Sequence, residues 1–285
     1  MKYGKVDLAK EYGLKGGELS CIAIDVPWDP WNQPPNWKRP AVIIVPGGGY
    51  EKVSRREGEP TAMQFIARGF QAFVLNYTVG GEKGAPYPEQ LFEAAACVDY
   101  VKKHAQEYGV NPEEVFVIGF SAGGHIVGDL AVEYQDVSAK WGKEVDCKPT
   151  AVGLCYPVIS QNHGHQPSYD NLLYGYSDTE KQELLKTLNL DESVTENTPP
   201  AFIWTTAEDT CVPPDNAMRF AMALDKKGVA FELHVYPKGQ HGKATGHLES
   251  NIWKTEEDAK VLARIVRWTD DCASFFRMFV AERFQ

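Results

Sequence analysis

The sequence predicts an α/β protein with a mostly parallel central sheet that is covered by helices on both faces. From about residue 40 onward, short apolar runs alternate with longer stretches of helical periodicity, which is the pattern of repeated β–α units. The apolar runs lack polar alternation, as expected for strands buried on both sides. A chain of 285 residues suffices for one such domain, and we expect residues 1–285 to form a single domain.

The first β–α units come from the N-terminal third of the chain. The run AVIIV at 41–45 is typical of a buried strand, and it ends in the loop PGGGY at 46–50. Helical spacing over 61–68 stops at a glycine, and the run QAFVLNY at 71–77 predicts the next strand. Ahead of these units, residues 21–27 are expected to add antiparallel edge strands.

The middle of the chain predicts the longest helix. Its amphipathic pattern covers 88–108, and it is followed by NPEE at 111–114, a capped turn with Pro112 at the first helical position. The run VFVIG at 115–119 is a strand, and a helix over 121–134 follows it directly. We expect right-handed crossovers between these parallel strands.

The last units continue the same alternation. Strands are expected at 151–156, 201–207 and 231–236. Helices are expected at 214–227 and from about 255 to the C-terminus.

One interval breaks this rhythm. About 45 residues separate the strands at 151–156 and 201–207, far more than the roughly 2–6 residues of an ordinary connection. The sequence SDTE at 177–180 is a capping box that predicts a helix reaching Leu188. We predict that residues 158–198 form a small cap insertion over the active site. A surface excursion without a catalytic part is the alternative.

Composition excludes several classes of function. The formal net charge of −10 disfavours nucleic acid and anionic lipid as partners, since both are polyanions. No stretch approaches the roughly 18 apolar residues that span a bilayer, and no apolar run follows the N-terminal lysines as in a secretory signal; a cytoplasmic location is expected. The six cysteines form no C-x-x-C pair and are predicted to be reduced and mostly buried. No compact metal-ligand spacing is visible, so no metal or cofactor is expected, and the oligomeric state stays open.

The segment GFSAG at 119–123 matches the pattern G-x-S-x-G. Such a match arises by chance in roughly one chain in ten of this length, so its context matters. Here it follows a predicted strand and opens a predicted helix, and the sharp turn between them needs small residues beside the serine. Gly119 and Gly123 supply that room, and the turn aims the helix N-terminus at the hydroxyl. This context predicts Ser121 as a nucleophile.

A serine nucleophile needs a base that accepts its proton, and the chain has seven histidines. His241 lies in the loop after the last predicted strand, from which it can reach the serine at the C-terminal edge of the sheet. His247 is its rival. His125, one turn past the serine, is expected to be structural, and His163 and His165 in the predicted cap are candidates for substrate contact.

The third group must hold the imidazole in the right tautomer. Glu208 and Asp209 both follow the strand at 201–207, and neighbouring side chains in an extended segment point opposite ways. Only one of the two can therefore face the histidine. One helix and one strand fit between this pair and His241, as one further unit of the sheet requires.

Taken together, the segments PGGGY, GFSAGGH, TPPAFIW, AEDTCVPPDNA and GQHG resemble bacterial esterases of the α/β-hydrolase superfamily. Within it, they resemble acetyl-xylan-esterase-like and other carbohydrate-esterase-like enzymes, neighbours of the hormone-sensitive-lipase group. The resemblance covers about residues 20–250 and implies the α/β-hydrolase fold.

The resemblance also implies roles for individual residues. The acid of the D-x-x-V-P segment falls on Asp209, and the oxyanion donors of the GGG segment fall on Gly48 and Gly49, with the backbone N–H of Ala122 as the other donor. Hormone-sensitive-lipase relatives have histidine before the three glycines, where this chain has Pro46. That departure places the chain nearer the sugar-esterase branch.

Aromatic residues crowd a Pro-rich loop and the predicted cap, where flat ring faces suit sugars. Packing of the loop and the cap is the alternative. These residues are Trp28, Trp31, Trp37, Tyr169, Tyr174 and Tyr176. Arg55, Arg56 and Glu57 follow the glycine loop and either lie near the site or form an ion pair on a solvated turn.

The sequence therefore predicts a serine carboxylesterase that hydrolyses short-chain acyl esters through an acyl-enzyme, above all acetyl esters of sugars or xylo-oligosaccharides. A serine peptidase of the prolyl-peptidase type and a general short-chain carboxylesterase or lipase are the enzymatic alternatives. A binding protein that kept the fold would lack a member of the triad, whereas all three members are present. The expected partner is a small ester, with no nucleic acid or membrane partner.

Overall fold

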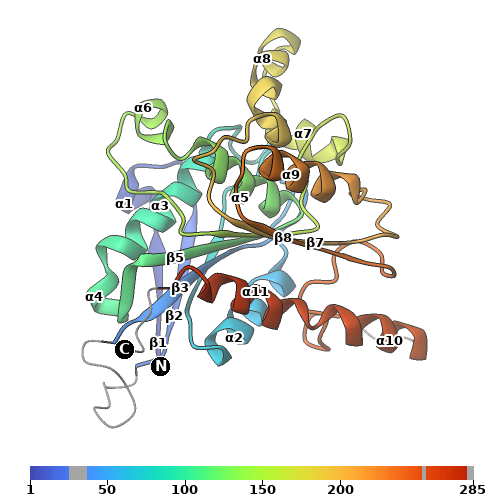
Figure 1. The fold of residues 1–285 in the computed structure, drawn as a ribbon. Coiled ribbons are helices and arrows are strands. Elements are labelled where there is room, and N and C mark those ends of the chain that lie inside the picture. The colour runs from blue at the N-terminus through green and yellow to red at the C-terminus, as the bar shows by residue number, and fades with distance from the viewer. Residues whose placement is uncertain (26–36, 252–254, 281–285) are drawn as a thin grey trace.

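The computed structural model describes residues 1–25, 37–251 and 255–280. Within them, eight strands form one sheet in the order β1-β2-β4-β3-β5-β6-β7-β8 (Figure 1). The strands are β1 (Lys2–Asp7), β2 (Glu18–Ala23), β3 (Arg39–Val45), β4 (Gln71–Asn76), β5 (Val110–Phe120), β6 (Val152–Cys155), β7 (Ala201–Thr206) and β8 (Phe231–Tyr236). The strands β1 and β2 are antiparallel to their neighbours, and all other pairs are parallel. The predicted α/β fold is confirmed. The antiparallel strands lie at Lys2–Asp7 and Glu18–Ala23 rather than over 21–27, and residues 26 and 27 lie outside the described residues.

Helices cover both faces of the sheet (Figure 1). They are α1 (Leu8–Tyr12), α2 (Glu59–Ala67), α3 (Glu89–Lys103), α4 (Ala105–Tyr108), α5 (Ala122–Glu133), α6 (Val137–Trp141), α7 (Gln166–Leu172), α8 (Asp178–Leu188), α9 (Asp215–Lys226), α10 (Glu256–Ile265) and α11 (Trp268–Arg277). The helices α3, α5 and α9 pack into one buried apolar cluster. The helices α2 and α11 pack into a second cluster on the opposite face.

One predicted turn is wrong. The segment 111–114 does not open a helix but lies within β5, where the register against β3 shifts between Arg39 and Ala41. The Asn111 side chain still accepts a hydrogen bond from the Glu113 N–H, at 3.3 Å. A hydrogen bond typical of a turn thus occurs within an irregular part of β5, and the pairing with β3 continues on both sides of it.

Two predicted helices are each divided in two. The helix expected over 88–108 is interrupted at His104, whose ring stacks on Tyr100 and whose Nδ1 lies 2.9 Å from the Tyr100 carbonyl oxygen. The C-terminal helix is divided into α10 and α11. The second of these begins at Trp268, a fully buried ring whose Nε1 donates to the Ala244 carbonyl oxygen at 2.9 Å. In both places a side-chain contact with a backbone carbonyl marks the break.

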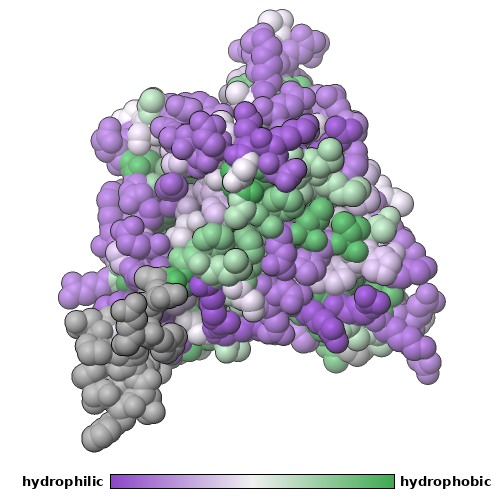
Figure 2. Space-filling model, viewed as in Figure 1, coloured by the Kyte–Doolittle hydropathy of each residue, from purple (hydrophilic) through white to green (hydrophobic). Residues whose placement is uncertain are grey.

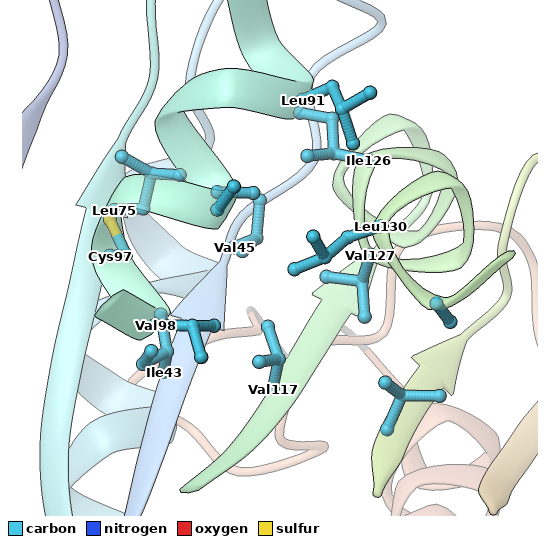
Figure 3. Close-up of a cluster of buried hydrophobic side chains, with 14 of the residues drawn as sticks. Ile43, Val45, Leu75, Leu91, Cys97, Val98, Val117, Ile126, Val127 and Leu130 are labelled. Carbon is cyan, nitrogen blue, oxygen red and sulfur yellow. The ribbon is translucent and has the colours of Figure 1, made fainter. Parts of the chain in front are cut away.

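The core between the sheet and the helices α3 and α5 fixes the strands that carry the site. Ile43 and Val117 point from β3 and β5 toward Val98 of α3 and toward Val127 and Leu130 of α5 (Figure 3). All five side chains are fully buried. Each buried side chain of this size contributes about 1.5–3 kcal/mol relative to exposure, so the positions of β3, β5 and α5 are tightly set.

The interval between β6 and β7 holds two helices and a 3₁₀ turn, η2 (Leu190–Glu192). The capping box predicted at 177–180 is present at the start of α8, and the helix ends at Leu188 as predicted. Figure 2 shows that α8 protrudes from the molecule with a largely hydrophilic surface. The helix α7 lies at its base (Figure 1).

Two further observations bear on the composition. Five of the six cysteines are buried, and Cys211 is exposed. In the described ranges, no helix combines the length and the apolar character needed to cross a membrane.

Candidate active site

Ser121 lies at the junction of β5 and α5. Its backbone has φ 52° and ψ −117°, a strained conformation for a residue with a Cβ atom, and its N–H donates to the Cys155 carbonyl oxygen at 3.0 Å. A Cβ atom at Gly119 would lie 2.2 Å from the Gly123 carbonyl oxygen, and one at Gly123 would lie 2.2 Å from the Val45 carbonyl oxygen. The turn therefore requires glycine at both positions, as the G-x-S-x-G pattern indicates.

His241 joins Ser121 to Asp209. Its Nε2 lies 2.8 Å from Ser121 Oγ, and its Nδ1 lies 2.6 Å from Asp209 Oδ2. Because a carboxylate only accepts hydrogen bonds, Nδ1 donates to Asp209, which leaves Nε2 to accept the serine proton. The loop that carries His241 is held at its start by Thr206, whose Oγ1 donates to the Gly239 carbonyl oxygen at 2.7 Å.

The two neighbouring acids at the end of β7 have different surroundings. Asp209 is 3% exposed, and its Oδ1 accepts from the N–H groups of Cys211 at 3.0 Å and Val212 at 2.9 Å. Glu208 turns away, and its Oε1 lies 2.9 Å from the Lys238 ammonium, which lowers the pKa of Glu208. Asp209, rather than Glu208, contacts the imidazole.

This difference gives a direct comparison of Asp209 and Glu208. Asp209→Asn is expected to lower kcat by about 10³- to 10⁴-fold, because the amide keeps the shape but loses the charge and favours the wrong imidazole tautomer. Glu208→Gln is the matched control and is expected to stay near wild type, since its exposed ion pair with Lys238 contributes little and glutamine keeps an oxygen that can accept from the Gly239 N–H. Steady-state kinetics with p-nitrophenyl acetate measures both. Equal or reversed losses would assign the acid role to Glu208.

The glycine loop after β3 presents backbone donors near the nucleophile. Gly48 has φ 131° and Gly49 has φ 64°, and a Cβ atom at Gly48 would lie 1.9 Å from the Lys52 carbonyl oxygen. Across the described residues, the N–H groups of Gly48, Gly49 and Ala122 donate no hydrogen bond. The Asn171 side chain of α7 donates to the Gly49 carbonyl oxygen at 2.9 Å and so holds the orientation of that part of the loop.

Two other histidines weighed in the sequence analysis are His125 and His247, and neither imidazole ring is hydrogen-bonded to Ser121 Oγ among the described residues. His125 is buried, and its Nε2 donates to the Leu188 carbonyl oxygen at 3.0 Å while Nδ1 accepts from the Tyr50 hydroxyl at 2.8 Å. Burial lowers the pKa of His125 to about 4, so this ring is neutral and connects the glycine loop to the end of α8. The backbone N–H of His247 donates to Thr245 Oγ1 at 3.2 Å.

The interval between β6 and β7 brings one histidine close to His241. His165 precedes α7, and its Nδ1 lies 3.0 Å from Ser168 Oγ. Burial, and to a lesser degree the charge of His241, lowers the pKa of His165. Ser168 in turn faces the glycine loop, since a Cβ atom at Gly49 would lie 3.8 Å from its Oγ. Polar side chains at the start of α7 and just before it thus lie near the glycine loop and His241.

The other residues that the sequence analysis singled out between β6 and β7 lie elsewhere. His163 contacts Asp215 at the start of α9, with 3.0 Å between Nδ1 and Oδ2. Tyr169 is 2% exposed and packs in the core, and the Tyr176 hydroxyl donates to a backbone carbonyl at 2.7 Å. Tyr174 is exposed. The packing alternative therefore holds for Tyr169.

The tryptophans of the Pro-rich loop are only partly described. Trp28 and Trp31 lie outside the described residues. The Arg39 guanidinium lies 4.9 Å from the centre of the Trp37 ring. No group of three or more His, Cys, Asp or Glu side chains in the described part of the chain is arranged to hold a metal ion.

Two residues at the site were missed or left open by the sequence. Glu57 is buried, and its Oε2 accepts from the Gly47 N–H at 2.9 Å, so the ion pair on a solvated turn is wrong for this residue. Tyr156, at the end of β6, donates to Glu57 Oε1 at 2.8 Å, and its ring lies 5.0 Å from that of His241. The sequence around Glu57, with Arg55 and Arg56 before it, does not indicate burial. A tyrosine at the end of a strand, such as Tyr156, is typical of a core residue.

Comparison with known proteins gives two relatives that share much of this chain. An endo-1,4-beta-xylanase B of Butyrivibrio fibrisolvens is 39% identical over 72% of the chain, and an acetylxylan esterase of Xylanibacter ruminicola is 31% identical over 75%. The chain spans only 32% and 43% of these two relatives, respectively. Each relative therefore has extensive sequence outside the shared region.

A solved structure and a family model extend the likeness. The acetyl ester-xyloside bifunctional hydrolase of Caldicellulosiruptor lactoaceticus is 32% identical, with a TM-score of 0.75 over 92% of this chain and 88% of its own. The BD-FAE family model matches residues 31–224. The chain has the α/β-hydrolase fold, resembles carbohydrate esterases, and belongs to the BD-FAE family.

Proposed function

We propose that this protein is a serine carboxylesterase that removes short acyl groups, above all acetyl groups, from sugars such as xylo-oligosaccharides. The observation that carries the proposal is the continuous chain of hydrogen bonds from Asp209 through His241 to Ser121, with distances of 2.6 and 2.8 Å. This is the arrangement of a nucleophile, its base and the group that orients the base.

In the first half of the reaction, Ser121 Oγ attacks the ester carbonyl carbon while His241 Nε2 takes the hydroxyl proton. The carbonyl oxygen becomes an oxyanion, which accepts hydrogen bonds from the backbone N–H groups of Gly48, Gly49 and Ala122. When the tetrahedral intermediate collapses, the bond to the alcohol oxygen breaks. The proton on His241 passes to that oxygen, and the acyl group stays on Ser121.

The second half repeats these steps with water. His241 takes a proton from the water as its oxygen attacks the acyl carbon, and the same backbone donors hold the second oxyanion. The bond to Ser121 Oγ then breaks, and the serine regains its proton from His241. Asp209 stabilises the imidazolium that forms in each half, and its two backbone hydrogen bonds fix the orientation of its carboxylate.

Sugar esters are favoured by the relatives and by the polar character of the site. Two similar proteins carry acetylxylan esterase or acetyl ester-xyloside hydrolase in their names. Residues 158–198 act in this proposal as a small cap on a single domain. This cap brings His165 near His241, and it brings Ser168 and Asn171 beside the glycine loop. Hydroxyl and imidazole groups of this kind pair with sugar hydroxyls.

The acyl preference is the prediction that tests this function. We expect kcat/KM to be highest for acetate and to fall for chains beyond about four carbons, because each methylene gains about 0.8 kcal/mol only where an apolar wall buries it. The measurement is a series of p-nitrophenyl esters from acetate to decanoate, beside acetylated xylo-oligosaccharides. A maximum at about eight carbons or longer, without acetate release from the sugars, would contradict the sugar-ester proposal and favour a lipase.

A further inference from the structure

Glu57 is a buried carboxylate that contacts the glycine loop beside Ser121. It ends the 3₁₀ turn η1 (Arg55–Glu57) and is 3% exposed. Oε2 accepts from the Gly47 N–H at 2.9 Å, and Oε1 accepts from the Tyr156 hydroxyl at 2.8 Å. In the described part of the chain, no lysine, arginine or histidine forms an ion pair with it. Burial of a carboxylate on neutral donors is costly, which points to a specific role.

Tyr156 extends this contact to the loop after β8 that carries His241 and Ala244, which we call the histidine loop. Its hydroxyl oxygen accepts from the Ala244 N–H at 2.9 Å, and its ring lies edge-on to the His241 ring, with 5.0 Å between centroids. Both Tyr156 and Ala244 have positive φ angles, 38° and 47°, which side chains with a Cβ adopt only where their surroundings enforce it. The hydrogen bonds at Tyr156 contribute to that enforcement.

The glycine loop also lies close to Ser121. A Cβ atom at Gly47 would lie 2.9 Å from the Cβ of Ser121 and 3.0 Å from Glu57 Oε2. A continuous path thus runs from Gly47 through Glu57 and Tyr156 to Ala244. It connects the loop that presents the oxyanion donors with the loop that carries the base, directly beside Ser121.

We propose that Glu57 is a positioning residue that, through Tyr156, holds the glycine loop and the histidine loop in register around Ser121. The inference rests on the proposed esterase function. A carboxylate suits this role because it is acceptor-only and takes one donor on each oxygen. A glutamine side chain has only one acceptor oxygen, so it can accept from the Gly47 N–H or from the Tyr156 hydroxyl but not from both. Its NH₂ group then lies where the second carboxylate oxygen accepted a hydrogen bond.

The test is Glu57→Gln, assayed with p-nitrophenyl acetate. We expect kcat to fall about 10- to 100-fold, because displacements of about 1 Å in a catalytic group have effects of this size. KM is expected to change by less than about threefold, since positioning acts on the transition state more than on substrate binding. A purely structural role would instead lower the thermal unfolding midpoint and leave kcat per folded molecule unchanged.

The matched control is Glu93→Gln. Glu93 is a buried carboxylate on α3 that accepts from the Thr78 N–H at 2.8 Å, away from the triad. Burial raises the pKa of Glu93 to about 7, so a neutral amide resembles a form that this side chain readily adopts. We expect this variant to keep wild-type kcat. An equal loss in both variants would mean that removing any buried carboxylate perturbs the enzyme, and would overturn the inference.

Tyr156→Phe tests the same path from its other end. It removes the hydroxyl and keeps the ring, and it is expected to lower kcat by a similar factor. The double variant with Glu57→Gln should be no worse than the more severe single variant, because both break one connected unit. If Glu57→Gln fails to fold, Tyr156→Phe carries the test alone, and wild-type kcat in it would overturn the inference.

The outcomes separate this inference from the function on which it rests. Multiplied losses in the double variant, or wild-type kcat in Glu57→Gln, would overturn the positioning role while the esterase function stands. A wild-type protein without activity on any p-nitrophenyl ester would overturn both.

Discussion

Replacing Ser121 by alanine is expected to lower kcat/KM for p-nitrophenyl acetate on the order of 10⁴-fold or more. In the proposed mechanism, Ser121 Oγ forms the acyl-enzyme, and His241 Nε2, 2.8 Å away, takes its proton. Without that oxygen, catalysis falls to what the backbone donors and substrate binding supply for direct attack by water. The measurement is steady-state kinetics on the variant at an enzyme concentration high enough to detect residual turnover.

The fold of this variant is expected to remain intact, because the positive φ angle of 52° at this position is no more strained for alanine than for serine. Ser20→Ala is a matched control, since Ser20 is a buried serine on β2 at the far side of the sheet. It should keep wild-type kinetics. More than a few per cent of activity in Ser121→Ala would contradict the assignment of the nucleophile.

His241→Ala is expected to cause a loss of similar size, on the order of 10⁴-fold. The ring is the only group within hydrogen-bond reach of Ser121 Oγ among the described residues, so its removal leaves the hydroxyl without a base. The double variant with Ser121→Ala should be no worse than either single variant, because the two residues act as one unit. Kinetics of the three variants on the same substrate measures this non-additivity.

His247→Ala is the control from the same segment of chain. Its backbone N–H contacts Thr245, and we expect near wild-type turnover when the side chain is removed. A severe loss of turnover in His247→Ala together with a mild loss in His241→Ala would assign the role of base to His247. Multiplicative losses in the double variant would show that Ser121 and His241 do not act together.

Much of the fold was predictable from sequence because local patterns and tertiary structure agree. The apolar runs on β3, β5 and β7 are buried on both faces, and the glycines beside Ser121 are there because a Cβ atom would strike the backbone. The segment 111–114 was misread because an Asn-Pro turn looks the same before a helix as within a strand irregularity. Only the pairing with β3 distinguishes the two.

The support of the site was less accessible to sequence reasoning. Glu57 and Tyr156 are 99 residues apart in the chain, and neither belongs to a pattern that indicates contact. Burial of a glutamate depends on tertiary packing, which periodicity does not report. The choice between Glu208 and Asp209 was likewise open from the residues alone, because both follow one strand and only the twist at its end decides which one turns inward.

Acetate release from acetylated xylo-oligosaccharides is the most direct test of the proposed function. Purified wild-type protein and Ser121→Ala are incubated with the same oligosaccharides, and free acetate is measured over time beside the intact sugar backbone. We predict that the wild type releases acetate without cleaving the backbone and that Ser121→Ala releases none above the rate in buffer. The proposed function would be contradicted if the wild type hydrolysed long-chain esters but released no acetate from the oligosaccharides. Equal acetate release by the wild type and Ser121→Ala would also contradict it.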